Sequence, residues 1–243
     1  MIIASWHSYA TDVQRNQAKR IHDRLTGVLP SNAVIDQMEI ALGSDATGES
    51  AARIAIQNPA FYNVTLKNFA APWTNEAQSV FVPLNDYTAT VIGMVRDDVD
   101  FREVLSGDIL YTGTGSLGLT AAYSNTDNAH YEELEEKAID LSDQANLADV
   151  GQTTVRPGVA PAGVMTSRAA AEAFFEAGTN RAMFRFTMMN HLCTDLEPLK
   201  DVSRVPDHVR QDVTRSTGGD SRIFLNNCVG CRAGVECRGG GAG

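Results

Sequence analysis

Apolar residues recur at helical spacing along most of this chain, and residues that favour helix caps stand before them. Ala18, Ile21 and Leu25 fall on one face of a segment that follows Asp12 and meets Gly27. The Asp12 carboxylate can accept the first free backbone N–H groups of a helix, and glycine commonly ends one. The pattern therefore predicts a helix from Asp12 to Gly27 with one buried face.

A second helical pattern begins at Asn58. This residue can cap a helix, and Pro59 suits its first turn because proline lacks the N–H that would be unpaired there. Tyr62, Leu66 and Phe69 then follow at helical spacing. They are predicted to share the buried face of this helix.

Asn85 introduces a third helix. Tyr87, Val91, Met94 and Val95 form its predicted buried face. A short helix is predicted shortly afterwards, because the sequence DFRE at residues 100–103 resembles a capping box and the helix can end at the Ser-Gly pair of residues 106–107.

The middle of the chain departs from the helical pattern. Residues 111–129, YTGTGSLGLTAAYSNTDNA, are rich in turn formers and predict a long loop or a small hairpin. The segment HYEELEEKAIDLSD then predicts an acidic helix with Leu134, Ala138 and Leu141 turned inward. Residues 152–163, QTTVRPGVAPAG, indicate a linker or an ordered excursion over the surface.

Two more helices are predicted, one from Ser167 to Ala177 and one from about Thr179 to Cys193. Together the patterns predict a mainly α protein, an irregular helical domain with a long Gly/Ser/Thr-rich loop region near residues 107–129. The predicted organisation is a helical region at 1–150, a linker or surface excursion at 151–165, a helical region of the same domain at 166–227, and a Cys/Gly-rich tail at 228–243.

Composition narrows the possible partners and compartments. The 243 residues, 43% of them hydrophobic, suffice for one large domain or two small ones. A formal charge of -10 repels phosphate backbones, so no nucleic-acid partner is expected. No apolar run reaches the roughly 18 residues of a membrane span. The first apolar stretch is too short for a signal peptide, which predicts a cytoplasmic location for the chain as given.

The cysteines carry the most specific chemical signal. Cys228-Val-Gly-Cys231 begins the haem-attachment signature C-x-x-C-H, but Arg232 stands where the iron ligand is expected. A guanidinium stays protonated and cannot ligate iron. Two interpretations compete with haem attachment: a structural cysteine pair without cofactor, and a tetrahedral zinc or iron site. The candidate ligands of that metal site are Cys228, Cys231 and Cys237 with Cys193 or His191.

The segment GTGSLG, Gly113 to Gly118, matches two motifs of unrelated function. As G-x-G-x-x-G it would bind a dinucleotide only between a strand and a helix, and an acidic helix follows here instead of a second strand. The same residues come close to the G-x-S-x-G elbow of serine hydrolases, with Ser116 as nucleophile. A plain Gly/Ser turn is the other interpretation. The candidate partners of Ser116 are His191 or His208 as base and Asp195 or Asp207 as acid.

Four segments together resemble a family of bacterial proteins associated with cytochrome c-type domains, of the planctomycete and marine proteobacterial type. These segments are RIHDRLTGVLPS, DFREVLSGDILYTG, GVMTSRAAAEAFFEAGTNRAMFRFTMMNHLC and IFLNNCVGCRAG. The first resembles the family's first helix and turn, and the last resembles its C-x-x-C-H-x-G attachment segment. The resemblance covers most of the chain.

This resemblance implies a redox or electron-transfer role, a redox partner protein or small molecule, and an exported, periplasmic location. It makes Cys228 and Cys231 the attachment residues for haem c, while Arg232 departs from the family pattern. The expected function is that of a divergent or truncated relative of c-type cytochrome proteins. The alternatives are a small, esterase-like serine hydrolase that uses Ser116 and a non-catalytic binding module.

Overall fold

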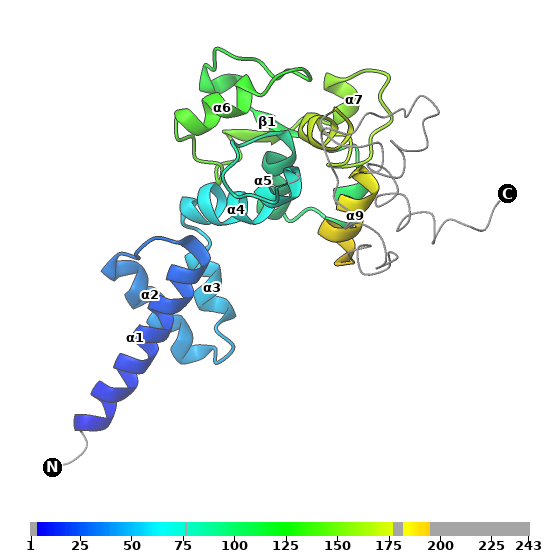
Figure 1. The fold of residues 1–243 in the computed structure, drawn as a ribbon. Coiled ribbons are helices and arrows are strands. Elements are labelled where there is room, and N and C mark those ends of the chain that lie inside the picture. The colour runs from blue at the N-terminus through cyan, green and yellow to red at the C-terminus, as the bar shows by residue number, and fades with distance from the viewer. Residues whose placement is uncertain (1–3, 76, 177–181, 195–243) are drawn as a thin grey trace, which may run out of the picture.

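The computed structural model describes residues 4–75, 77–176 and 182–194, and these residues are arranged mainly as helices (Figure 1). Of the residues described, 59% are helical and 3% lie in strands, which confirms the prediction of a mainly α fold. The elements are α1 (Ala4–Thr26), α2 (Asn32–Ser44), α3 (Glu49–Ala55), η1 (Phe61–Leu66), α4 (Lys67–Ala70), η2 (Ala71–Thr74), α5 (Asp86–Arg96), η3 (Phe101–Leu105), β1 (Tyr111–Gly113), η4 (Gly115–Leu117), α6 (Ala129–Glu136), β2 (Leu147–Asp149), α7 (Gln152–Val155), α8 (Arg168–Ala171), η5 (Glu172–Glu176) and α9 (Ala182–Leu192).

The first three helices pack around a small core of their own. Figure 1 shows them on one side of the molecule, with the remaining elements on the other. α1 ends before Gly27, whose φ of 71° suits a helix terminator, as predicted. The helix begins at Ala4, however, so the predicted start at Asp12 is wrong. The buried members of this core are Ala18, Ile35, Met38, Leu42, Ala51 and Ala55.

The helix predicted after Asn58 forms, but it is not a regular α-helix. Asn58 Oδ1 accepts a hydrogen bond from the N–H of Ala60, at 3.0 Å. The chain then runs through the π-helical segment η1, the α-helical turn α4 and the 3-10 turn η2. A π turn holds more residues than an α turn, so it rotates later residues away from the α-helical pattern. Leu66 is buried as predicted, whereas Phe69 is 56% exposed and does not share its face.

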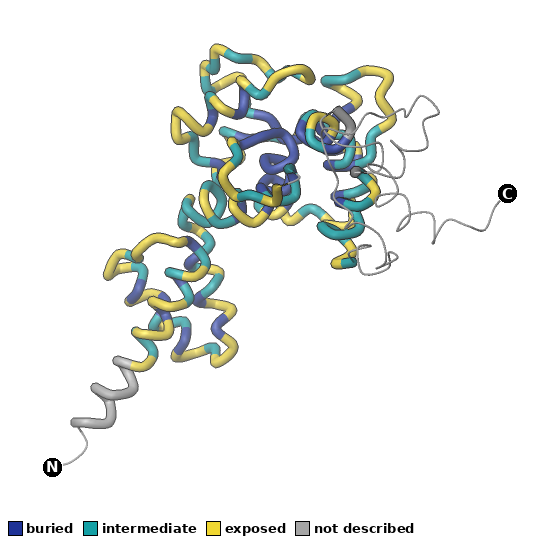
Figure 2. Tube along the Cα trace, in the orientation of Figure 1, coloured by how far each residue is buried: buried dark blue, intermediate teal, exposed yellow. Residues whose placement is uncertain are grey.

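Helix α5 is the central element of the larger core (Figure 2). The Asn85 side chain caps it as predicted, because Oδ1 accepts a hydrogen bond from the N–H of Thr88 at 3.0 Å. Every residue from Asp86 to Met94 is buried, so this helix is surrounded and has no solvent face over that length. Val95 is 40% exposed, and its prediction as a core residue is wrong because the last turn of α5 reaches the surface.

The two short strands pair across the middle of the chain. β1 and β2 are antiparallel, with Tyr111 opposite Asp149 and Gly113 opposite Leu147. The partner of β1 therefore lies beyond residues 111–129, not within a hairpin of that segment. Helix α6 is shorter than predicted, because the backbone turns left-handed at Ala138, with φ 49°. Leu134 and Leu141 are buried as predicted, while Ala138 is exposed.

The buried side chain of Gln152 helps to attach the segment predicted as a linker or surface excursion to the larger core. Gln152 has no exposed surface, and its Nε2 donates to the carbonyl oxygens of Ile109 and Gly163, at 3.1 and 2.5 Å. Gly163 has a φ of 53°, and a Cβ there would lie 2.0 Å from the Val104 carbonyl oxygen. The buried amide and the close backbone contact fix this segment against η3 and the residues just before β1.

A polar network joins the end of α5 to the strand β1. Arg96 donates two hydrogen bonds to Asp97, at 2.8 and 2.7 Å, and its guanidinium lies 5.6 Å from the centre of the Tyr111 ring. The Tyr111 hydroxyl and the Gln144 amide also donate to the Asp97 carboxylate, at 2.9 and 2.8 Å. These donors, Arg96 foremost, lower the pKa of Asp97 to about 2.

We expect this network to contribute to acid unfolding. The folded pKa of Asp97 is below its ordinary value of 3.8, so its stabilisation is present above that value and is lost as the pH falls towards 2. The free energy of unfolding of the wild type, measured in urea at about pH 5 and about pH 3, should therefore fall more steeply than that of Asp97→Asn. Parallel pH profiles for the two proteins would contradict this role for Asp97.

Candidate functional site

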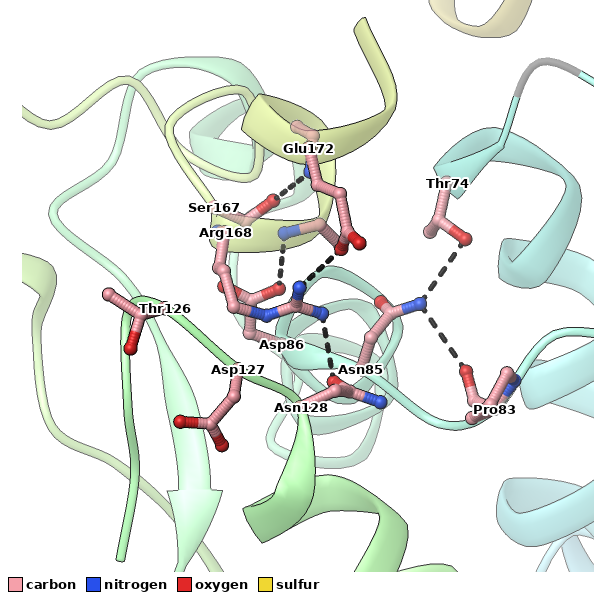
Figure 3. A network of polar contacts seen from close by, with 12 residues as sticks. Thr74, Pro83, Asn85, Asp86, Thr126, Asp127, Asn128, Ser167, Arg168 and Glu172 are labelled. Carbon is pink, nitrogen blue, oxygen red and sulfur yellow. Dashed lines mark hydrogen bonds and ion pairs between the residues drawn. The ribbon is translucent and has the colours of Figure 1, made fainter. Parts of the chain in front are cut away.

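A cavity of about 510 Å³ opens where three segments distant in sequence meet, beside the start of α5 (Figure 3). Polar side chains from all three segments face one another there. The described lining residues are Thr74, Asn75, Val82, Pro83, Asn85, Thr126, Asp127, Asn128, Glu132, Arg168, Ala169, Glu172 and Ala173.

The buried carboxylate of Asp86 holds two walls of this cavity together. Asp86 is the first residue of α5 and has no exposed surface. Its oxygens accept hydrogen bonds from the N–H groups of Arg168 and Ala169, at 2.5 and 3.0 Å, and from its neighbour Tyr87 at 3.0 Å. The first N–H groups of a helix have no partner within the helix, so Asp86 satisfies those of α8. This arrangement fixes the start of α8 against the start of α5.

Two opposing effects act on the charge of Asp86. Burial raises its pKa, because a carboxylate loses its hydration when it leaves water. The backbone donors of Ala169 and Arg168 oppose this by stabilising the ionised form. Ser167 completes the cap, since its hydroxyl oxygen accepts from the N–H of Ala170 at 3.2 Å.

Arg168 links a second pair of elements at the cavity. Its side chain is only 10% exposed. One terminal nitrogen donates to Asn128 Oδ1 at 2.9 Å, and the other forms an ion pair with Glu172 one turn later (Figure 3). The Asn128 amide in turn donates to the carbonyl oxygen of Leu84 at 2.8 Å. The guanidinium therefore joins α8 and η5 to the start of α6.

The wall from η2 to α5 is fixed in the same manner. The Asn85 amide donates to Thr74 Oγ1 at 3.2 Å and to the Pro83 carbonyl at 3.4 Å, while its oxygen caps α5. Asn75 donates to the carbonyl oxygens of Ala71 and Ser79, at 2.9 and 3.0 Å. These polar side chains are thus held in place by the protein itself.

The lining has an excess of negative charge. Asp127, Glu132 and Glu172 supply three carboxylates, and Arg168 supplies one guanidinium. A hydrogen bond from the Ser124 hydroxyl, assisted by the Ala129 N–H, lowers the pKa of Asp127 below its ordinary value. The field inside the cavity therefore favours positive charge.

The residues predicted for a serine hydrolase have other partners in the structure. Ser116 is exposed in η4, and its Oγ lies 2.7 Å from Thr114 Oγ1 and 3.3 Å from the Ala145 carbonyl oxygen. The Nε2 of the half-buried His191 lies 2.7 Å from the Tyr87 hydroxyl, and burial lowers the pKa of His191. Asp195, Asp207 and His208 lie outside the described residues. The triad stays a prediction.

The segment GTGSLG lacks the surroundings that dinucleotide binding requires. The strand β1 ends at its first residue, Gly113, but the 3-10 turn η4 lies within the segment where a helix would have to begin. Gly113 instead donates its N–H to Nε2 of the buried His130, at 2.9 Å, and His130 Nδ1 donates to the Ala121 carbonyl at 2.8 Å. The segment is a turn that His130 fixes.

Most of the predicted cofactor residues fall outside the part of the chain that the structure describes. Cys228, Cys231, Cys237 and Arg232 all lie outside the described residues. Cys193 is described, and it is exposed just after the end of α9. Within the described ranges, no group of three or more His, Cys, Asp or Glu side chains is placed to hold a metal ion. Haem and zinc stay predictions.

No helix among the residues described is both long and apolar enough to cross a membrane. Comparison with known proteins finds no family model, curated protein or solved structure that matches this chain.

Proposed function

We propose that this chain is a non-catalytic binding module and that its site is the cavity around Arg168. The observation that carries the proposal is that the polar lining is organised by the protein alone. Asp86, Arg168 and Asn85 each join two elements at the cavity through hydrogen bonds. A site that is formed before its ligand arrives avoids the cost of ordering side chains on binding. The volume of about 510 Å³ suits a small organic molecule.

The lining supports binding rather than catalysis by a hydroxyl, thiol or amine nucleophile. No described lining residue is a Ser, Cys, Lys, His or Tyr. Of the two threonines, Thr74 donates its hydroxyl to the Ala71 carbonyl at 2.8 Å, and the Thr126 hydroxyl pairs with Ser124 at 2.9 Å. A hydroxyl, thiol or amine nucleophile activated by a neighbouring base is thus lacking among the residues that line the described cavity.

A tryptophan placed at an exposed residue of the cavity lining tests this proposal. Thr126 is exposed and lines the cavity, so Thr126→Trp should fill it without disturbing the core. Ala122→Trp places the same ring in the same loop, at an exposed position that does not line the cavity. We expect saturation-transfer NMR with glucose, glutamate, putrescine and agmatine to detect a compound that binds the wild type and Ala122→Trp but not Thr126→Trp. Failure of all these compounds to bind would contradict the proposal.

We also propose that the chain is a divergent relative of c-type cytochrome proteins with a redox role. The observation that favours this second function is the cysteine pair Cys228 and Cys231 at haem-attachment spacing. Arg232 does not fit the expected ligand, because a guanidinium puts a fixed positive charge where iron needs a neutral nitrogen. Haem c, if attached, would be held through thioethers to the two cysteines.

Restoring one imidazole tests the second proposal. We expect Arg232→His, produced with an export signal in a host that matures c-type cytochromes, to acquire partial covalent haem, because the substitution completes the C-x-x-C-H signature. The wild type should acquire none. Haem staining of a denaturing gel gives the readout, with Cys228→Ala/Arg232→His as the control that should lose the stain. Absence of stain from Arg232→His would favour a structural cysteine pair.

A further inference from the structure

We infer that the cavity selects a small organic cation, bound through an ammonium or guanidinium group by the carboxylates of Asp127, Glu132 and Glu172. This inference rests on the proposed binding function and adds the chemical class of the ligand. It follows from which hydrogen-bonding groups of the lining are already used and which are not.

Most side-chain donors of the lining are already used within the protein. The amides of Asn75, Asn85 and Asn128 each donate to at least one carbonyl oxygen, as described above. Both terminal nitrogens of Arg168 have acceptors in Asn128 and Glu172. Arg168 Nε has no partner among the described residues, but this atom is shielded from solvent and therefore from the cavity. A ligand that mainly accepts hydrogen bonds would find few donors.

Acceptors, in contrast, remain available. An ionised carboxylate has about four lone-pair positions. Glu132 accepts one long hydrogen bond, from Asn128 at 3.3 Å, and Glu172 accepts from Arg168 while its side chain stays 62% exposed. Asp127 accepts from the N–H of Ala129 at 3.1 Å and from the Ser124 hydroxyl. The lining thus offers several unoccupied carboxylate positions, and a donor-rich group fits them.

The charge balance selects among donor-rich ligands. With three carboxylates against one guanidinium, the lining repels an anion. Arg168 gives an anion no compensating contact, because it is largely buried and already paired. A neutral polyol would satisfy the acceptors but would leave the excess negative charge uncompensated. A cation satisfies both requirements.

The apolar part of the lining favours an organic cation over a metal ion. Val82, Pro83, Ala169 and Ala173 also face the cavity, and they can contact a short carbon chain. The volume of about 510 Å³ greatly exceeds that of a single ion, and the carboxylates are not grouped as metal ligands in the described part of the chain.

Agmatine, which carries one guanidinium and one ammonium group, is the probe for the test. We expect calorimetric titration of the full chain to show binding that weakens about tenfold in Glu132→Gln, an isosteric change that removes one charge. Glu136→Gln removes the same charge from an exposed position of α6 outside the cavity and should bind like the wild type. Binding should also weaken with added salt, because the attraction is between charges.

The outcomes separate this inference from the proposed function. Equal agmatine affinity in Glu132→Gln and Glu136→Gln would overturn the assignment of the carboxylates. Binding of glucose or glutamate instead of agmatine, abolished by Thr126→Trp, would overturn the inference that the ligand is a cation. It would leave the proposed binding function standing. Agmatine binding that persists in Thr126→Trp would place the agmatine site on another surface and overturn the inference. Binding of none of these compounds would overturn both proposals.

Discussion

Asp86→Ala should lower the free energy of unfolding by about 3–5 kcal/mol, because each buried N–H group left without an acceptor costs about 1–3 kcal/mol. The change removes the acceptor of the Arg168 and Ala169 N–H groups and leaves both donors buried without a partner. It also releases α8 from α5, so the cavity should lose its fixed shape and its ligand. Urea unfolding followed by circular dichroism measures the first effect.

Two further variants make this expectation specific. Glu136→Ala removes a carboxylate from an exposed position and should change stability by less than about 0.5 kcal/mol. Asp86→Asn keeps one acceptor oxygen but turns an amide toward the other N–H group. Its free energy of unfolding should therefore lie between those of the wild type and Asp86→Ala. A loss in Asp86→Ala no larger than that in Glu136→Ala would show that the two helix starts do not depend on this carboxylate.

Gly93→Ala should lower the free energy of unfolding by about 3 kcal/mol, because the added methyl group has no room. A Cβ at Gly93 would lie 2.2 Å from Cδ1 of the Tyr111 ring, far inside van der Waals contact. The ring cannot easily withdraw, because its hydroxyl donates to Asp97 at 2.9 Å. Alanine improves helix propensity by about 1 kcal/mol over glycine, but the clash outweighs this gain.

The same substitution at another glycine is the matched control. A Cβ at Gly115 would meet no atom within 4 Å, so Gly115→Ala should leave the urea midpoint unchanged or raise it slightly. A midpoint for Gly93→Ala equal to that of Gly115→Ala would contradict the close packing of α5 against Tyr111. The pair thus separates the effect of crowding from the general effect of replacing glycine.

The elements that local sequence could predict are those whose ends depend on neighbouring residues. Asn85 caps α5 through an N–H three residues away, and Gly27 follows the end of α1 with a left-handed backbone. The errors arise where the backbone leaves the α-helical geometry. Phe69 was expected to be buried because its spacing is α-helical, but the π segment before it changes the rotation. Ala138 was expected inside α6, which ends before it in a left-handed turn.

The cavity was not predicted, because its contacts join residues far apart in the sequence. The local pattern around Asn85 indicates a helix start, and it gives the neighbouring Asp86 no special role. That role requires α8 to lie against α5, which brings the N–H of Arg168 to a carboxylate 82 positions earlier. An acid directly after a cap residue is a weak signal that sequence alone could have offered. The cysteine pair was conspicuous in sequence, yet it lies outside the described residues.

The separation of the two hydrophobic cores affects the order in which the chain can fold as it is synthesised. All buried members of the smaller core lie between Ala18 and Ala55. The larger core spans Leu66 to Phe186, so its contacts await a much later part of the chain. Local contacts form faster than distant ones, and domains generally fold from the N-terminus during translation. On the ribosome, α1, α2 and α3 can therefore pack while the partners of α5 have yet to emerge.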